Sequence, residues 1–236
     1  MKKGISIHEV TKSFLGTNGD KVYALDKLTF EPPHGKITAL IGPSGCGKST
    51  LLNIIGGFET ADTGEVCLQA MNGQKPCMVF QSPALFDWLT VSQNVEFGLK
   101  RQHVPIKERK RAVRQMLTWV GLEAFKDAYP NELSGGMKQR VALARVLVLR
   151  PPMLLMDEPF AALDARLREK MQDLLLTVWE KLQLTVLFVT HDVEEALRIS
   201  EQVVVFTERP GRIRASIEVK KDKLSECRSA IYKALL

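Results

Sequence analysis

The sequence lacks the long hydrophobic runs that would place it inside a membrane. No stretch approaches the roughly 18 consecutive apolar residues of a transmembrane helix. The first residues, Met1 to Ser6, also lack the apolar core of a secretory signal peptide. We therefore expect a cytoplasmic chain whose role at a membrane, if it has one, depends on partner subunits.

Cysteine is scarce, and the spacing of the thiols excludes common metal and disulfide frameworks. The four cysteines are Cys46, Cys67, Cys77 and Cys227. None belongs to a C-x-x-C pair, so the pattern fits neither a structural zinc site nor a set of disulfides. Isolated thiols of this kind are typical of a reducing compartment.

The overall composition is that of a folded, mildly basic protein. The 236 residues are 45% hydrophobic and 25% charged, which argues against disorder and suffices for one large α/β unit with a small subdomain. The formal net charge of +6 is compatible with nucleic acid, an anionic membrane surface or a polyphosphate ligand. A solvated basic surface explains it more simply, so the charge alone selects no function.

The order of the expected elements indicates an α/β fold. Residues 4–41 predict short strands, which lead into a glycine-rich loop and a helix over 48–55. Helices dominate 90–149. Residues 153–156 and 185–190 predict short apolar strands of the kind that are buried on both faces of a parallel sheet.

The strongest local motif lies between a predicted strand and a predicted helix. Gly42, Pro43, Ser44, Gly45, Cys46, Gly47, Lys48 and Ser49 match G-x-x-x-x-G-K-[ST]. Glycines let backbone N–H groups close around phosphate oxygens, and the helix start adds partial positive charge. Lys48 is then placed to reach the β- and γ-phosphates, Ser49 to bind Mg²⁺, and Thr50 to add a phosphate contact. The flanking strand and helix argue against a mere glycine-rich turn.

A second motif ends a predicted buried strand. Residues 153–156 carry Asp157 and Glu158 to the carboxyl end of that strand, the edge where ligands of open α/β sheets bind. There Asp157 would hold Mg²⁺, and Glu158 would orient or deprotonate the attacking water. Acidic residues also favour helix N-termini, so the pair alone is equally compatible with a helix cap.

A third motif, Leu133-Ser134-Gly135-Gly136, predicts a second anion site. Ser134 suits the N-cap of a helix, and Gly135 and Gly136 leave backbone N–H groups accessible. Alone it would be an ordinary cap followed by loop glycines. Its place between the phosphate loop and the carboxylate strand favours a functional role.

With these motifs in order, the chain resembles the ATP-binding subunits of ABC transporters over nearly its whole length. Residues 42–49 match the Walker A motif, and 153–158 match Walker B. Gln81 matches the Q-loop glutamine, Asp164 the D-loop and His191 the switch histidine, while 133–137 match the signature motif.

The resemblance implies a P-loop NTPase core with an N-terminal antiparallel β subdomain and a helical subdomain. Within one ABC ATPase domain over 1–236, residues 1–84 and 151–236 would form the core, and about 85–150 the helical part. Phe14 stands where the family stacks an aromatic ring on adenine, and Tyr23 is a rival for that role.

The resemblance also implies a mechanism. Two chains, expected as a homodimer, pack head to tail, and each ATP with its Mg²⁺ lies between the Lys48 loop of one and the signature motif (Ser134, Gly135, Gly136) of the other. Gln81 would bind Mg²⁺ and sense the γ-phosphate, and Asp164 would adjoin the nucleotide. His191 would stabilise the transition state and hold the water together with Glu158.

Two other classes of protein fit the motifs less well. A soluble P-loop kinase has no use for the signature motif. ABC-type ATPases of DNA maintenance usually carry a coiled coil or zinc module between the Q-loop and the signature, and the segment from Gln81 to Ser134 shows neither. No nucleic-acid partner is expected, although a soluble ABC-type ATPase acting on DNA or another non-transport target is the alternative.

Two further segments indicate a subfamily. Residues 81–100, which include 84–91 and Asn94-Val95, resemble the nitrate, sulfonate and taurine importer ATPases of bacteria, and so does Glu208-Arg209-Pro210-Gly211-Arg212-Ile213. That resemblance implies permease subunits as partners, a solute-binding protein acting indirectly, and a peripheral place on the cytoplasmic face of the membrane. Phe86 to Val91 would receive a coupling helix of the permease. Because few residues follow the predicted core, we expect no large regulatory domain of the kind found in sugar-importer ATPases.

Overall fold

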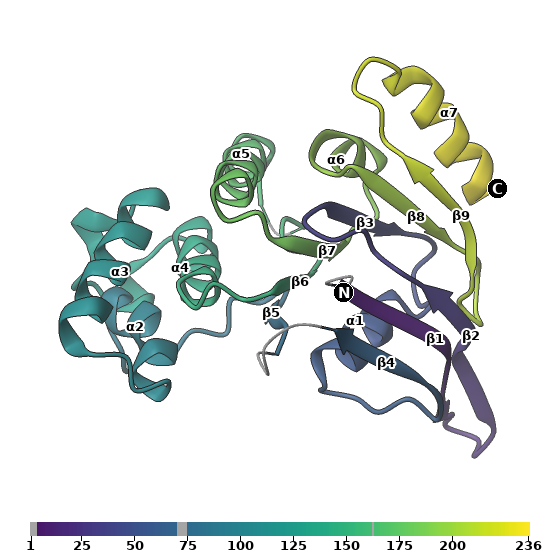
Figure 1. The fold of residues 1–236 in the computed structure, drawn as a ribbon, viewed down its shortest axis with the longest axis horizontal. Helices are drawn as coiled ribbons and strands as arrows, with labels where there is room; N and C mark the ends of the chain where they lie inside the picture. The colour runs from purple at the N-terminus through teal and green to yellow at the C-terminus, as the bar shows by residue number, and fades with distance from the viewer. Residues whose placement is uncertain (1–3, 70–74, 162) are drawn as a thin grey trace. The chain divides into compact units, whose positions relative to one another are not determined.

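A computed structural model describes residues 4–69, 75–161 and 163–236 (Figure 1). The chain divides into two compact units, which are described separately. The first comprises Met1–Pro76, Pro152–Glu158 and Gln183–Leu236, and the second comprises Cys77–Pro151 and Pro159–Leu182.

The first unit begins with an antiparallel sheet in the order β2-β1-β4. Its strands are β1 (Gly4–Leu15), β2 (Lys21–Phe30) and β4 (Thr63–Gln69). One face is apolar because Ile5, Ile7 and Val10 of β1 lie buried with Leu25 and Leu28 of β2. This sheet and the α/β class both agree with the sequence prediction.

Five further strands of this unit run side by side in the order β6-β7-β3-β8-β9. They are β3 (Ile37–Ile41), β6 (Met153–Asp157), β7 (Thr185–Val189), β8 (Gln202–Phe206) and β9 (Ile213–Glu218). The first four are parallel, and β9 is antiparallel to β8. All residues of β3 and β7 are buried, which explains why a two-residue alternation is missing from their sequences.

Helices cover both faces of this second sheet. Helix α1 (Lys48–Gly56) packs against β6 and β7, whereas α6 (Val193–Ile199) and α7 (Leu224–Leu235) lie side by side on the opposite face (Figure 1). Since β3, β6 and β7 are parallel, the segments that follow them leave the sheet at one edge. That edge therefore gathers the loop after Ile41, the residue Glu158 and the segment of His191.

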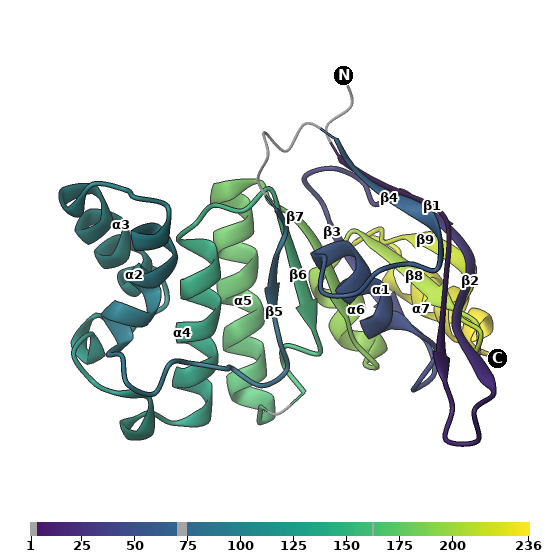
Figure 2. The same ribbon diagram turned by 90° about the horizontal axis from the view of Figure 1, so that it is seen from below.

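The second unit is mainly helical. It contains β5 (Cys77–Val79), α2 (Val91–Arg101), α3 (Ile106–Trp119), α4 (Gly135–Leu147), α5 (Ala165–Leu182) and the short 3₁₀ turns η1 (Glu123–Phe125) and η2 (Pro130–Glu132). Helix α2 packs on α3 and α4, and α4 runs beside α5 (Figure 2). Helix α2 begins with a capping box, in which Thr90 accepts from the backbone N–H of Gln93 and the Gln93 side chain accepts from that of Thr90.

One element was not anticipated from the sequence. Helix α7 occupies residues for which no helix was predicted, and only Cys227 and Ile231 of it are buried. None of the helices in the described parts of the chain combines the length and the apolar composition needed to cross a bilayer.

Candidate functional site

The loop from Gly42 to Gly47 links β3 to α1 and is shaped by close contacts that only glycine permits. Gly45 and Gly47 have positive φ angles of 75° and 97°. A Cβ atom on Gly47 would lie 2.5 Å from the carbonyl oxygen of Ala24, and one on Gly42 would lie 2.8 Å from Cβ of Phe206. The backbone can therefore fold tightly around a small group, as the motif predicts.

Lys48 closes this loop with its ammonium group. Its Nζ atom donates to the carbonyl oxygens of Gly42 at 2.7 Å and Pro43 at 2.8 Å, and the residue is only 7% exposed. These oxygen partners are neutral carbonyls rather than carboxylates, so they do not offset the positive charge of a lysine ammonium group toward an anion in the loop. The arrangement is suited to phosphate.

Ser49 and Asp157 meet although they are far apart in the sequence. The Ser49 hydroxyl donates to Oδ1 of Asp157 at 2.9 Å. Burial raises the pKa of Asp157, with the charge of Glu158 acting in the same direction, and the hydrogen bond from Ser49 and the charge of Lys48 oppose it. A bound cation would favour the ionised carboxylate, and a hydroxyl beside a carboxylate is an oxygen donor set that suits Mg²⁺.

Glu158 and His191 form a second pair at the same sheet edge. Glu158 Oε1 lies 3.7 Å from Nδ1 of His191, which is 68% exposed. Glu158 has a φ of 44°, an unusual value for a residue other than glycine, and its N–H donates to Val189 O at 3.2 Å. No helix begins at Asp157 and Glu158, since α5 starts at Ala165, so the cap interpretation does not apply.

His191 is held by the start of α6. Asp192 is the N-cap, and its Oδ1 accepts from the backbone N–H groups of Glu194 at 2.8 Å and Glu195 at 3.2 Å. The cap fixes the backbone immediately after His191. The position from which the imidazole extends, beyond the end of β7, is therefore defined.

Ser134, Gly135, Gly136, Asp164 and Gln81 belong to the second unit. Ser134 caps α4 by accepting from Met137 N at 3.4 Å, and Gly136 is pressed against Leu167, whose Cδ2 would lie 2.1 Å from a Cβ at that glycine. Asp164 Oδ1 accepts from Leu167 N at 2.9 Å at the start of α5. Gln81 is exposed after β5, and Gly135 opens α4 with free space around it. Their roles toward a nucleotide stay predictions.

Phe14 and Tyr23 face opposite sides of the antiparallel sheet. Phe14 pairs with Val22 and Tyr23 with Ser13, and adjacent residues on a strand point to opposite faces. Both rings are accessible, at 43% for Phe14 and 46% for Tyr23. Only one of them can therefore present its ring to a given ligand, and Lys12 Nζ already lies 5.3 Å from the centre of the Phe14 ring.

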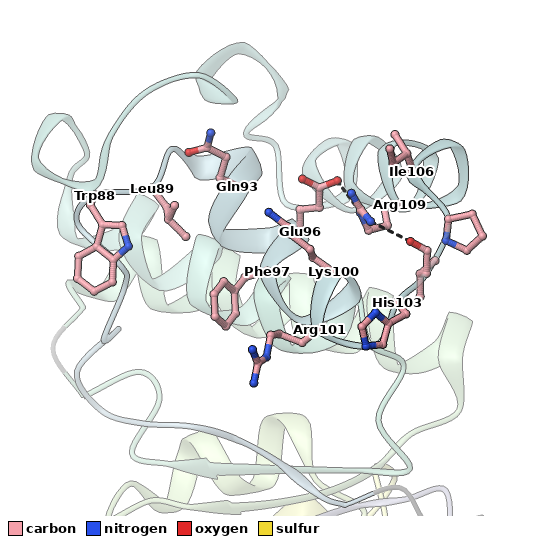
Figure 3. A pocket seen from close by; sticks show the side chains of 12 residues that line it. Trp88, Leu89, Gln93, Glu96, Phe97, Lys100, Arg101, His103, Ile106 and Arg109 are labelled. Atoms are coloured by element: carbon pink, nitrogen blue, oxygen red, sulfur yellow. Dashed lines mark hydrogen bonds and ion pairs between the residues drawn. The ribbon is translucent and has the colours of Figure 1, made fainter.

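A pocket of about 1050 Å³ lies between α2, α3 and the preceding loop, and we call it the α2–α3 pocket (Figure 3). Its walls include Trp88, Leu89, Phe97, Lys100, Ile106 and Arg109. Trp88 is 73% exposed, and Arg109 is tied to Glu96 Oε1 at 2.9 Å and to Val104 O at 2.9 Å. The sequence indicated Trp88 and Leu89 but missed the helical wall, which only the packing of α2 on α3 creates.

The loop before α2 is fixed by a buried amide. Asn94 is fully buried, and its Nδ2 donates to the carbonyls of Phe86 at 3.1 Å and Leu89 at 2.9 Å, while its Oδ1 accepts from Phe86 N at 3.0 Å. The Phe86 ring lies 4.6 Å from that of Phe97 and 5.4 Å from that of Trp88. Asn94 therefore fixes the backbone of the loop that carries the exposed Trp88 ring.

Comparison with known proteins agrees with these features. The profile of the family described as ABC transporter matches residues 25–161. The taurine import ATP-binding protein TauB of Roseobacter denitrificans is 45% identical over 214 residues, covering 89% of this chain and 80% of that relative. The nitrate import ATP-binding protein NrtD of a Synechocystis species is 44% identical over 219 residues, covering 91% of this chain and 82% of that relative. A solved dimeric ATP-binding cassette in a post-hydrolysis state with ADP and Pi matches with a TM-score of 0.79 at 33% identity, covering 92% of this chain and 99% of that one.

Proposed function

This chain belongs to the ABC transporter family of ATP-binding proteins, and on that premise we propose that it hydrolyses ATP to drive a solute importer. The observation that carries the proposal is the hydrogen bond from Ser49 to Asp157 beside a glycine loop closed by Lys48. Together these groups offer a cation, backbone donors and two adjacent oxygen ligands to one triphosphate and its metal.

The residues of the first unit divide the binding of Mg-ATP among them. Lys48 and the N–H groups of residues 44–50 would hold the phosphates, and Ser49 and Asp157 would hold Mg²⁺. Mg²⁺ neutralises charge on the phosphate oxygens when it is bound. By the family resemblance, Gln81 would bind Mg²⁺ and sense the γ-phosphate. Phe14 stacks on the adenine.

Glu158 and His191 act on the attacking water. A carboxylate near an imidazole can orient a water molecule and accept its proton, and the exposed His191 is free to contact the departing phosphate. The positive φ of Glu158 is consistent with this assignment, because strained backbone conformations cluster at active sites.

Two protomers complete each site. In a head-to-tail dimer, Ser134, Gly135, Gly136 and Asp164 of one protomer face the nucleotide on the phosphate loop of its partner. The start of α4 supports an anion at Gly135, which is exposed with open space around it, whereas Gly136 is buried against Leu167 and the N–H of Met137 already bonds the Ser134 side chain. The solved cassette with ADP and Pi is dimeric, which supports a dimer of this chain.

The α2–α3 pocket is the proposed docking site for the permease. Trp88 and Phe97 are exposed there, and Asn94 holds the loop before α2 by hydrogen bonds. Exposed aromatic side chains on a well-held loop are typical of a protein interface. The chain would then sit on the cytoplasmic face of the membrane, with a solute-binding protein delivering cargo to the permease. The names of the relatives support a small solute of the nitrate, sulfonate or taurine class.

Phosphate release with Mg-ATP tests the proposal. Lys48→Ala should lower turnover about 100-fold or more, because the cation facing the phosphates is lost. Lys21→Ala removes an exposed lysine of β2 and serves as the control. Undiminished turnover by the Lys48 variant would refute the placement of the triphosphate. Co-purification with permease subunits, set against stimulation of hydrolysis by DNA, tests the transport role.

A further inference from the structure

The turn between β8 and β9 carries part of the subfamily motif and is closed by hydrogen bonds of its own. Thr207 N donates to Arg212 O at 2.9 Å, and Arg212 N donates back to Thr207 Oγ1 at 3.0 Å. Thr207 Oγ1 also donates to Pro210 O at 3.1 Å. These bonds fix the backbone of residues 207–212, and with it the positions from which the side chains of the turn extend.

This turn is fastened to the first sheet and to the phosphate loop. Gly211 N donates to Ala24 O at 2.9 Å, and Arg212 pairs with Asp26. A Cβ atom on Gly211 would lie 2.0 Å from the carbonyl oxygen of Cys46, so the turn and the loop are in direct contact. Only glycine permits this approach.

Arg209 extends from the turn to the loop itself. Its Nε donates to the carbonyl oxygen of Gly45 at 3.0 Å. A planar trans peptide places its carbonyl oxygen and the following N–H on opposite sides. Holding Gly45 O toward Arg209 therefore turns the N–H of Cys46 away from it, where Pro43 O accepts at 3.4 Å. That bond is long, and a phosphate oxygen is a stronger acceptor.

We propose that Arg209 is a positioning residue for nucleotide binding, which fixes the Gly45–Cys46 peptide so that its N–H is available to phosphate. The proposal rests on the proposed function of the loop. Nothing in it requires Arg209 to touch the nucleotide, because its guanidinium acts through a neutral carbonyl. The bond spans 164 residues of sequence, so it couples the closing strands of the sheet to the phosphate loop.

The affinities of Arg209→Ala and Arg209→Gln for Mg-ADP and Mg-ATP, measured by calorimetry, test this role. The loss of one partly exposed hydrogen bond should weaken both nucleotides by a similar factor, about fivefold to tenfold. KM for ATP should rise by the same factor with kcat nearly unchanged, as expected when ground-state and transition-state binding fall together. Arg209→Lys should recover only part of the affinity, because a lysine lacks the Nε–H fixed in a planar group.

Arg214→Ala is the matched control. Arg214 lies on β9, and its Nη1 donates to Ala234 O at 3.2 Å in α7, so its loss should leave nucleotide affinity unchanged. Unchanged affinity in both Arg209 variants would overturn the proposal. Weakened ATP binding with normal ADP binding would also overturn it, since that result indicates direct contact with the γ-phosphate. A wild-type protein that binds neither nucleotide would instead refute the proposed function.

Discussion

The Nδ1 atom of His191 lies 3.7 Å from Oε1 of Glu158, although the two residues follow different strands. Strands β6 and β7 are parallel, and Asp157 is paired with Val189 in their register. That register places the residue after β6 near the segment after β7, so the sheet itself sets the distance between carboxylate and imidazole. A shift of one residue in either strand would separate them.

Glu158→Gln tests the chemistry of this pair. The amide keeps the shape of the side chain but cannot accept a proton, so we expect hydrolysis to fall by about 100-fold or more. ATP binding should persist, and the undivided triphosphate should hold two protomers together as a stable dimer. Sizing chromatography with Mg-ATP and a phosphate-release assay measure the two effects.

The control for this variant is the same protein with ADP, which should stay monomeric because the γ-phosphate is missing. A Glu158→Gln protein that hydrolyses ATP at the wild-type rate, or that stays monomeric with ATP, contradicts the assigned role.

Lys221 supports α6 from the opposite end. Its Nζ donates to the carbonyls of Leu197 at 2.8 Å, Arg198 at 2.9 Å and Ser200 at 3.3 Å, at the C-terminus of the helix. Burial lowers the pKa of Lys221, against the opposing charge of Glu201. Lys221→Met keeps the apolar stem and removes the donor, so unfolding in urea should show a loss of about 1–3 kcal/mol.

Lys220→Met is the companion variant, since Lys220 is exposed beside it. Its free energy of unfolding should match that of the wild type. Equal stability of both variants would show that water replaces the lysine at the helix end without cost.

Features that depend on residues close together in the sequence could be predicted, and features that depend on residues far apart in the sequence could not. The glycine loop, the Ser134 cap and the end of α1 at Gly57 depend on a few neighbouring residues, so their motifs suffice. Helix α7 was missed because its two buried residues form too weak an apolar pattern. The contact of Arg209 with Gly45 joins distant segments, and no local pattern encodes it.

Phe14 and Tyr23 give opposite predictions because they lie on opposite faces of the antiparallel sheet. Phe14→Ala should weaken ATP binding by about tenfold, because a stacking ring is lost, and Tyr23→Ala should leave it unchanged. Displacement of a fluorescent ATP analogue measures both variants. Weaker binding in Tyr23→Ala alone would assign the adenine contact to the other face.

Trp88 offers the clearest test of the α2–α3 pocket. Its side chain is 73% exposed and lines the pocket beside Phe97, so it contributes little to folding in the isolated chain. A large aromatic ring buried in an interface is often a major source of binding energy. Trp88→Ala should therefore weaken association with the permease subunits about tenfold or more. The Trp88→Ala protein alone should hydrolyse ATP at the wild-type basal rate, because the α2–α3 pocket contains none of the residues assigned to phosphate binding.

Phe125→Ala provides the matched variant for this measurement. Phe125 is an aromatic residue of the same unit, 45% exposed, and it lies outside the walls of the α2–α3 pocket. If the pocket docks the permease, affinity purification of the detergent-solubilised complex should retain the permease with Phe125→Ala and lose it with Trp88→Ala. Equal retention by the two variants would place the docking surface elsewhere. Loss in both would indicate that the aromatic surface of the helical unit acts as a whole, because a single pocket cannot explain an effect at η1.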